Sequence, residues 1–203
     1  VWLGSVWDLD TMEVAVEAER ARRLRRRIQR ARAKPPSRRR LEKLIGGLEF
    51  VAEIVRPGRA AMHGLRRALA DLNAGEGGQW SREAADELKW WADVLQRPDR
   101  LRWPLPWRPR DSAATVATDA STTGFGFLWG DRGWFGAWPG DHTSGDMTLL
   151  EARALRVMLA TIGPELRGRA IVVLTDNEAL QAVVTRRRAM AEDLNREVFR
   201  ILN

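Results

Sequence analysis

The sequence contains no cysteine, so it offers no disulfide framework, no thiolate zinc site and no cysteine nucleophile. No apolar run approaches the roughly 20 residues of a membrane span, and the N-terminus lacks the basic start and long apolar stretch of a signal peptide. The chain also lacks an initiator methionine, from which we expect a fragment of a longer protein. Together these absences favour an intracellular setting, in the cytoplasm or the nucleus, without a membrane partner.

The charge balance is positive: 34 Lys and Arg against 27 Asp and Glu give a formal net charge of +7. With 203 residues, 44% of them hydrophobic, the chain is long enough for one good core or two small ones. A basic surface favours a polyanionic partner, because neutralising phosphates releases counterions. Nucleic acid is the first interpretation; an acidic membrane surface and a merely solvated basic face are the alternatives.

The first half is expected to be mostly helical after a short hairpin. Residues 2–7 and 12–16 suit two strands, with the turn residues DLDT between them. Apolar residues at helical spacing then predict four helices, at 17–33, 37–55, 62–72 and 81–95. The proline-rich stretch 97–112 cannot continue a helix or lie in a central strand, so it is interpreted as a connector with a domain boundary near residue 110.

The second half changes to strand-like alternation. TVATDA, GFGFLW and GWFGAWP predict three strands, the first two joined by polar residues and the last two by the turn GDRG. A helix at 148–162 follows, and the β-branched run at 169–175 is typical of a buried parallel strand. Two short helices complete the order β-β-β-α-β-α-α.

Three acidic residues stand out against this pattern. Asp119 and Asp176 each end an apolar strand, and Glu151 lies on the helix stripe that must face the sheet. A right-handed crossover would set the two strands parallel, and if they are neighbours their carboxyl ends form a switch point where ligands bind. Taken singly, either aspartate could instead start a turn or cap a helix, as Asp176-Asn177 could before EALQAVV.

Three carboxylates brought together repel one another unless a hard cation such as Mg²⁺ lies among them. Such a site can hold two ions roughly 4 Å apart and assist a phosphodiester displacement. The acidic residues therefore favour metal-assisted cleavage of a nucleic-acid backbone.

The order of elements with these acids resembles the ribonuclease H fold, and TDAS, LLEARAL and LTDN resemble its motifs in retroelement reverse transcriptases. WLGSVWDLDTMEVAV and the helices after it are similar to the end of a palm and to a thumb and connection segment, most of all in DIRS-like and gypsy-like retrotransposon polyproteins. The resemblance implies an α/β fold: a ribonuclease H-like mixed sheet (β-β-β-α-β-α, truncated) preceded by a mostly helical thumb/connection-like segment. It divides the chain into a palm-like hairpin (1–16), a helical region with its proline-rich connector (17–110) and a C-terminally incomplete ribonuclease H-like domain (111–203).

The same resemblance implies a nuclease that cleaves the RNA strand of RNA–DNA hybrids. Asp119, Glu151 and Asp176 would be its catalytic and metal-binding residues, with two Mg²⁺ ions, or Mn²⁺, as cofactors. The fourth acid of the family follows a fifth strand, and neither is expected in this chain, because Asp193 comes too early in the order. The paired aspartates of the polymerase site are absent from the sequence. The expected partner is an RNA–DNA hybrid or another nucleic acid.

Two further interpretations stay open. A noncatalytic, connection-like module or a decayed retroelement remnant would bind nucleic acid without cutting it, and a basic structural domain would hold its three acids far apart. The sequence does not identify the residues that contact nucleic acid; the candidates are Arg23, Arg26, Arg27 and Arg30. Four tryptophans could stack bases or pack a core: Trp90, Trp91, Trp103 and Trp107. His63 and His142 are expected at the surface without partners.

Overall fold

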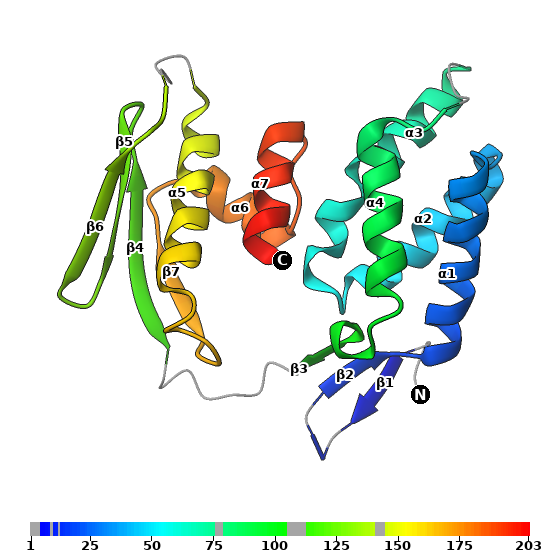
Figure 1. Cartoon of the computed structure of the whole chain (residues 1–203), viewed down its shortest axis with the longest axis horizontal. Helices are drawn as coiled ribbons and strands as arrows, with labels where there is room; N and C mark the ends of the chain where they lie inside the picture. The colour runs from blue at the N-terminus through cyan, green and yellow to red at the C-terminus, as the bar shows by residue number, and fades with distance from the viewer. Residues whose placement is uncertain (1–4, 9, 12, 76–78, 105–112, 141–144) are drawn as a thin grey trace. The chain divides into compact units, whose positions relative to one another are not determined.

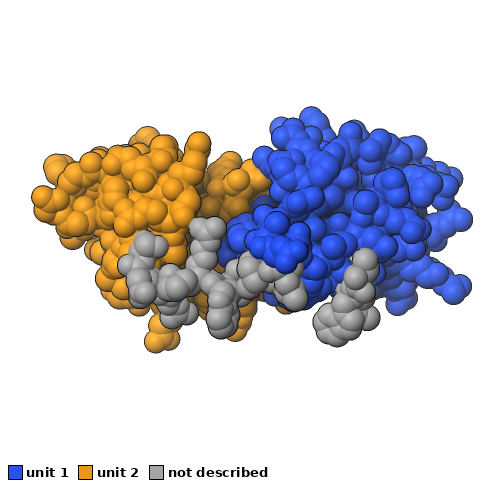
Figure 2. All heavy atoms as spheres, turned by 90° about the horizontal axis from the view of Figure 1, so that it is seen from below, with its two compact units in different colours: residues 1–107 blue, residues 108–203 orange. Residues whose placement is uncertain are grey.

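The chain divides into two compact units, Val1–Trp107 and Arg108–Asn203, which are coloured separately in Figure 2. The computed structural model describes residues 5–8, 10–11, 13–75, 79–104, 113–140 and 145–203. Each unit has a sheet of its own, of three strands in unit 1 and four in unit 2. Within the described ranges, no helix has both the length and the apolar character that crossing a membrane requires.

Unit 1 begins with the predicted hairpin. Strand β1 (Ser5–Asp8) pairs antiparallel with β2 (Glu13–Val16), and Ser5 lies opposite Val16. The carboxylate of Asp8 accepts the N–H groups of Thr11 and Asp10 in the turn. These hydrogen bonds favour the ionised carboxylate, the one from Thr11 most strongly, and they lower the pKa of Asp8.

A third strand, β3 (Arg102–Pro104), joins the free edge of β2. The expectation that 97–112 is only a connector is therefore wrong at these three residues; positions 105–112 lie outside the described residues. Pro104 is tolerated because β3 is an edge strand, where a missing N–H leaves no ladder bond unmade.

Helices make up the rest of unit 1, and the four predicted ones are confirmed (Figure 1). They are α1 (Ala18–Ala33), α2 (Arg38–Ala52), α3 (His63–Asn73) and α4 (Arg82–Val94). Two 3₁₀ segments connect them to their neighbours: η1 (Arg56–Met62) and η2 (Pro98–Leu101). Helix α2 ends three residues earlier than predicted. The N–H groups of Glu53 and Ile54 donate to carbonyls three residues earlier, as in a 3₁₀ turn, so the α-helical hydrogen-bond pattern stops before Pro57.

The core of unit 1 contains Trp91, which is fully buried and donates its indole N–H to the carbonyl of Ala61 at 2.8 Å. Trp90 meets it edge-on at 4.9 Å between ring centroids, and the Arg56 guanidinium lies 3.9 Å over the Trp103 ring. Trp107 lies outside the described residues. Of the two roles considered for these tryptophans, base stacking and core packing, Trp91 thus has the second.

Unit 2 contains a mixed sheet in the order β6-β5-β4-β7 (Figure 1). Strands β4 (Ala114–Ala120), β5 (Gly124–Trp129) and β6 (Arg132–Ala137) form an antiparallel meander. Helix α5 (Met147–Ile162) then crosses over to β7 (Ile171–Leu174), which pairs in parallel with β4. The chain ends with α6 (Glu178–Arg186) and α7 (Glu192–Leu202). This is the predicted ribonuclease H-like order, preceded by the predicted helical segment.

Helix α5 lies between the sheet and α7 (Figure 1). Val116 and Phe127 of the sheet pack against Leu155 and Met158 of α5. On the other side of α5, Glu197 of α7 is 4% exposed and accepts hydrogen bonds from Arg156 and Arg200. The opposite face of the sheet carries exposed apolar side chains: Leu128, Phe135, Val172 and Leu174.

Candidate metal centre

Asp119 lies near the C-terminal end of β4. Strand alternation turns it away from the core residues Val116 and Thr118, so its carboxylate is exposed. Its neighbour across the sheet is Gly126, which has no side chain to cover it. A cavity of about 250 Å³ opens beside it, lined by Asp119, Ala120, Ser121, Gly124, Phe125, Gly126 and Gly136.

Glu151 reaches the same strand end from α5. It shares a stripe with Leu155 and Met158, which pack on the sheet, and it is only 7% exposed. The hydroxyl of Thr175 donates a hydrogen bond to its Oε2 at 3.1 Å. The prediction that Glu151 faces the sheet is therefore confirmed.

Asp176 directly follows Thr175 at the end of β7. The capping residue of α6 is Asn177, whose side-chain Oδ1 accepts the N–H of Leu180 at 2.8 Å. The carboxylate of Asp176 is exposed and accepts no hydrogen bond from any described residue. Of the pair that could have formed a cap, the asparagine takes that role and the aspartate is left free to bind.

The three carboxylates converge. One oxygen from each of Asp119, Glu151 and Asp176 lies within 4.8 Å of the other two. The parallel register that sets Ala117 opposite Leu174 causes this, because it brings the carboxyl ends of β4 and β7 to the same edge. The interpretation as a basic structural domain, which required the acids to be far apart, is wrong.

The donor set fits a hard divalent cation. Mg²⁺ binds oxygen at about 2.1 Å, so oxygens on opposite sides of one ion are about 4.2 Å apart. The observed span is slightly wider, and the exposed side chains of Asp119 and Asp176 are free to close it by rotation. Carboxylate oxygens suit Mg²⁺ or Mn²⁺, whereas structural zinc sites favour sulfur and nitrogen. These residues could hold such an ion.

Asp193 does not belong to this cluster. It lies exposed on α7, where its carboxylate accepts a hydrogen bond from Arg196 at 3.1 Å. This placement agrees with its exclusion as a fourth acid. Among the described residues, the cluster of potential metal ligands consists of the three acids from β4, α5 and β7.

Four candidate arginines form one ridge on α1, which we call the α1 arginine ridge: Arg23, Arg26, Arg27 and Arg30. All four are exposed, while Leu24 and Ile28 of the same helix are buried. Arg27 donates to the carbonyl of Lys43, and none of the four forms an ion pair with a described residue. Their charge is thus available to an anionic partner.

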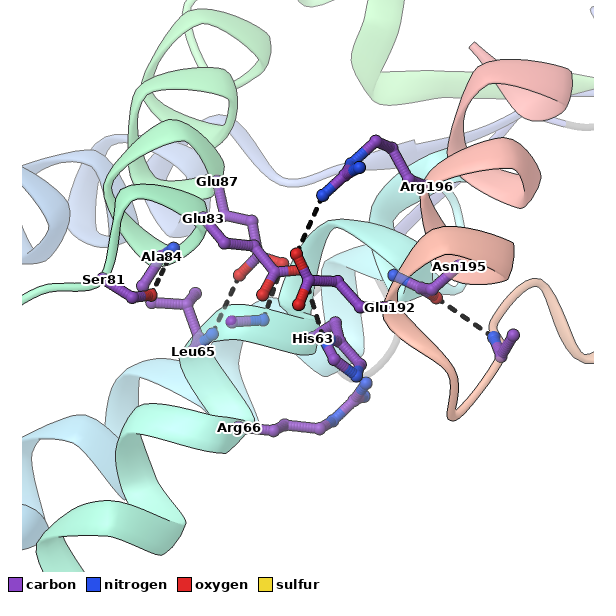
Figure 3. Close-up of polar contacts among 12 residues, drawn as sticks. His63, Leu65, Arg66, Ser81, Glu83, Ala84, Glu87, Glu192, Asn195 and Arg196 are labelled. Atoms are coloured by element: carbon purple, nitrogen blue, oxygen red, sulfur yellow. Dashed lines mark hydrogen bonds and ion pairs between the residues drawn. The ribbon is translucent and has the colours of Figure 1, made fainter. Parts of the chain in front are cut away.

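The sequence pattern missed another buried carboxylate, Glu87 of α4 (Figure 3). Its two oxygens accept the N–H groups of Gly64 and Leu65, at the start of α3, at 2.9 Å each. Burial raises the pKa of Glu87 to about 7, although the two amides and His63 oppose the rise. Its position three residues after Ala84 and four before Trp91, on the buried stripe, was the available signal.

His63 has a partner, contrary to expectation. Its Nδ1 lies 3.1 Å from the carboxylate of Glu83, and the contact is partly buried (Figure 3). The sequence alone does not indicate this partner, because the contact depends on how α3 packs against α4. His142 lies outside the described residues.

Comparison with known proteins gives distant similarities to solved structures. No protein-family model matches the sequence, and no curated protein matches it. A foamy viral protease-reverse transcriptase in complex with double-stranded DNA is 16% identical, with a TM-score of 0.42 over 89% of this chain and 32% of that one. A foamy viral protease-reverse transcriptase in complex with an RNA/DNA hybrid is 14% identical, with a TM-score of 0.33 over 96% of this chain and 27% of that one. The chain thus spans at most about a third of these proteins.

Proposed function

We propose that unit 2 is a ribonuclease H-type, metal-dependent nuclease that acts on the RNA strand of RNA–DNA hybrids. The observation that carries this proposal is the convergence of Asp119, Glu151 and Asp176 within 4.8 Å. The order of the strands and of the crossover helix supports it, since the acids lie at the ends of β4 and β7 and on α5, as the resemblance to the ribonuclease H fold implies. Unit 1 would then correspond to the palm-like hairpin (1–16) and the thumb/connection-like region (17–110) of a retroelement reverse transcriptase.

In this proposal the three acids would hold Mg²⁺, and the bound ion would stabilise the negative charge that develops on the phosphodiester oxygens. Glu151 is buried and fixed by a hydrogen bond, so it gives the site a defined inner wall. Asp119 and Asp176 are exposed, so a nucleic-acid backbone can approach them from solvent. The cavity beside Asp119 leaves room for groups next to the reacting phosphate.

The test is cleavage of an RNA–DNA hybrid labelled on the RNA strand, with Mg²⁺, with Mn²⁺ and with EDTA. We expect cleavage only with the metals and a loss of more than about 10-fold in Asp119→Asn, because a charged carboxylate ligand becomes a neutral amide. Asp131→Asn is the matched control, since Asp131 is exposed in the turn after β5, outside the cluster. Cleavage that survives Asp119→Asn would contradict the assignment.

Binding of nucleic acid without cleavage is the second candidate function. The α1 arginine ridge favours it, because four exposed guanidinium groups that have no carboxylate partner among the described residues form a surface that suits phosphates. A connection-like module or a decayed remnant would bind the hybrid in a salt-dependent manner. It would leave the RNA strand intact with either metal, so cleavage in the same experiment would exclude this candidate.

A further inference from the structure

Thr175 connects two of the three acidic residues. Its hydroxyl donates to Oε2 of Glu151 at 3.1 Å and accepts the backbone N–H of Asn177 at 3.2 Å. Asp176 therefore lies between two residues that are both held in place. Asn177 is further fixed as the cap of α6 and reaches the hydroxyl of Thr148, on α5, at 3.5 Å.

The direction of these hydrogen bonds follows from their chemistry. A backbone N–H can only donate and an ionised carboxylate can only accept, so the single hydroxyl proton of Thr175 must point at Glu151. Two bonds thus fix the hydroxyl, and its β-branched side chain restricts rotation about χ1. The result is a rigid donor aimed at one oxygen of the only buried acid in the cluster.

Glu151 needs such a donor. Its side chain has three rotatable bonds, and among the described residues Thr175 is its hydrogen-bond partner. Without this bond, a carboxylate that is 7% exposed would lose the one polar contact that fixes its orientation. Groups that hydrogen-bond a metal-ligating carboxylate typically change metal affinity by about 10- to 100-fold when removed.

We infer that Thr175 is a positioning residue that orients Glu151 for the divalent cation, an inference that rests on the proposed function of this site. The backbone N–H of Asn177 fixes the orientation of the Thr175 hydroxyl, and the hydroxyl in turn fixes the position of Glu151 Oε2. The second carboxylate oxygen of Glu151 is left to bind the ion. In the sequence TDN, the aspartate would then bind the ion directly, and the residues on either side of it would hold the carboxylate ligands in position.

The experiment measures Mn²⁺ binding to the full chain by calorimetry, independently of any cleavage. Thr175→Val removes the hydroxyl at nearly constant shape, and Thr175→Ser restores it. Thr161→Val is the matched control: its hydroxyl donates to the carbonyl of Val157 on the exposed side of α5, away from the cluster. Urea unfolding in EDTA shows whether each variant is folded before metal is added.

We expect Thr175→Val to bind Mn²⁺ about 10- to 100-fold more weakly than the wild type, with Thr175→Ser and Thr161→Val close to the wild type. Equal affinity of folded Thr175→Val and wild type would overturn the inference while leaving the proposed metal centre intact. Weak binding by the serine variant as well would also overturn it, because the hydroxyl would then not be the cause. A wild-type chain that binds no Mn²⁺ would refute the metal centre and the role of Thr175 together.

Discussion

The stability of unit 1 should depend on pH through Glu87. This carboxyl is 8% exposed, and burial raises its pKa from 4.5 to about 7. Between these values the folded protein keeps the Glu87 proton and the unfolded chain releases it, so the folded state binds more protons. The free energy of unfolding must therefore fall as the pH rises through this window. The contribution is fully present below pH 4.5 and is lost above about pH 7.

The magnitude follows from the size of the pKa rise. At about 1.4 kcal/mol per pH unit, a rise from 4.5 to about 7 corresponds to about 3 kcal/mol of unfolding free energy. Glu87→Gln removes the titrating carboxyl group. One backbone N–H of α3 then faces the glutamine NH₂ group instead of an oxygen, which lowers the free energy of unfolding by about 1–3 kcal/mol. The variant should be less stable than the wild type at pH 5, and this deficit should shrink or reverse by pH 8.

Urea unfolding at pH 5, 6, 7 and 8 measures this difference, and hydrogen exchange of the α3 amides assigns it to unit 1. Asp86→Asn is the control, because Asp86 is exposed on the same helix. The stability difference between wild type and Glu87→Gln should change by about 2–3 kcal/mol over this range, and that for Asp86→Asn should stay constant. A constant difference for Glu87→Gln would refute the reasoning, since Glu87 would then be ionised in the folded state throughout.

Two further pairs of variants test packing and charge. Gly64→Ala should destabilise unit 1 by about 1–3 kcal/mol in urea unfolding, because the new Cβ would lie 2.7 Å from the backbone nitrogen of Ala84. Gly46→Ala in α2 should instead stabilise unit 1 by about 0.5–1 kcal/mol, because a Cβ there has no atom within 4 Å and alanine favours a helix more than glycine does. Changing all four arginines of the α1 arginine ridge to glutamine should reduce the salt dependence of hybrid binding by about 3 in log–log slope. The control removes four arginines that already pair with carboxylates: Arg38, Arg97, Arg132 and Arg196. Equal effects of the two charge sets would contradict a specific role for the ridge.

The convergence of the three acids could be predicted because each step follows a strong rule. Strand alternation and a β-branched run indicate β4 and β7, and the length of the intervening helix requires a crossover, which sets the strands parallel. Glu151 interrupts an otherwise apolar stripe, so its direction is fixed by the helix period alone. The site was visible in sequence because regular elements, not loops, carry most of it.

Other features depend on contacts that no local pattern contains. Strand β3 is three residues long and ends in a proline, and it forms only because β2 offers an unpaired edge. The hydrogen bonds that the Glu87 carboxylate accepts come from backbone N–H groups 22 and 23 residues earlier in the chain. Ser37 and Ser81 precede helices in the same way, yet only Ser81 makes a capping hydrogen bond. In each case the local sequence is compatible with more than one structure, and tertiary packing determines which one forms.

The parallel pairing of β4 with β7 also sets the order in which the site can assemble. Strands β4, β5 and β6 pair with neighbours in sequence, whereas β7 pairs with β4 across the whole of α5. Closing so long a loop is slow, and until it closes the inner edge of β4 stays unpaired. All three carboxylates meet only once β7 has paired with β4, so their mutual repulsion opposes this pairing. A divalent cation that binds the folded cluster and not the unfolded chain should therefore stabilise unit 2 by mass action.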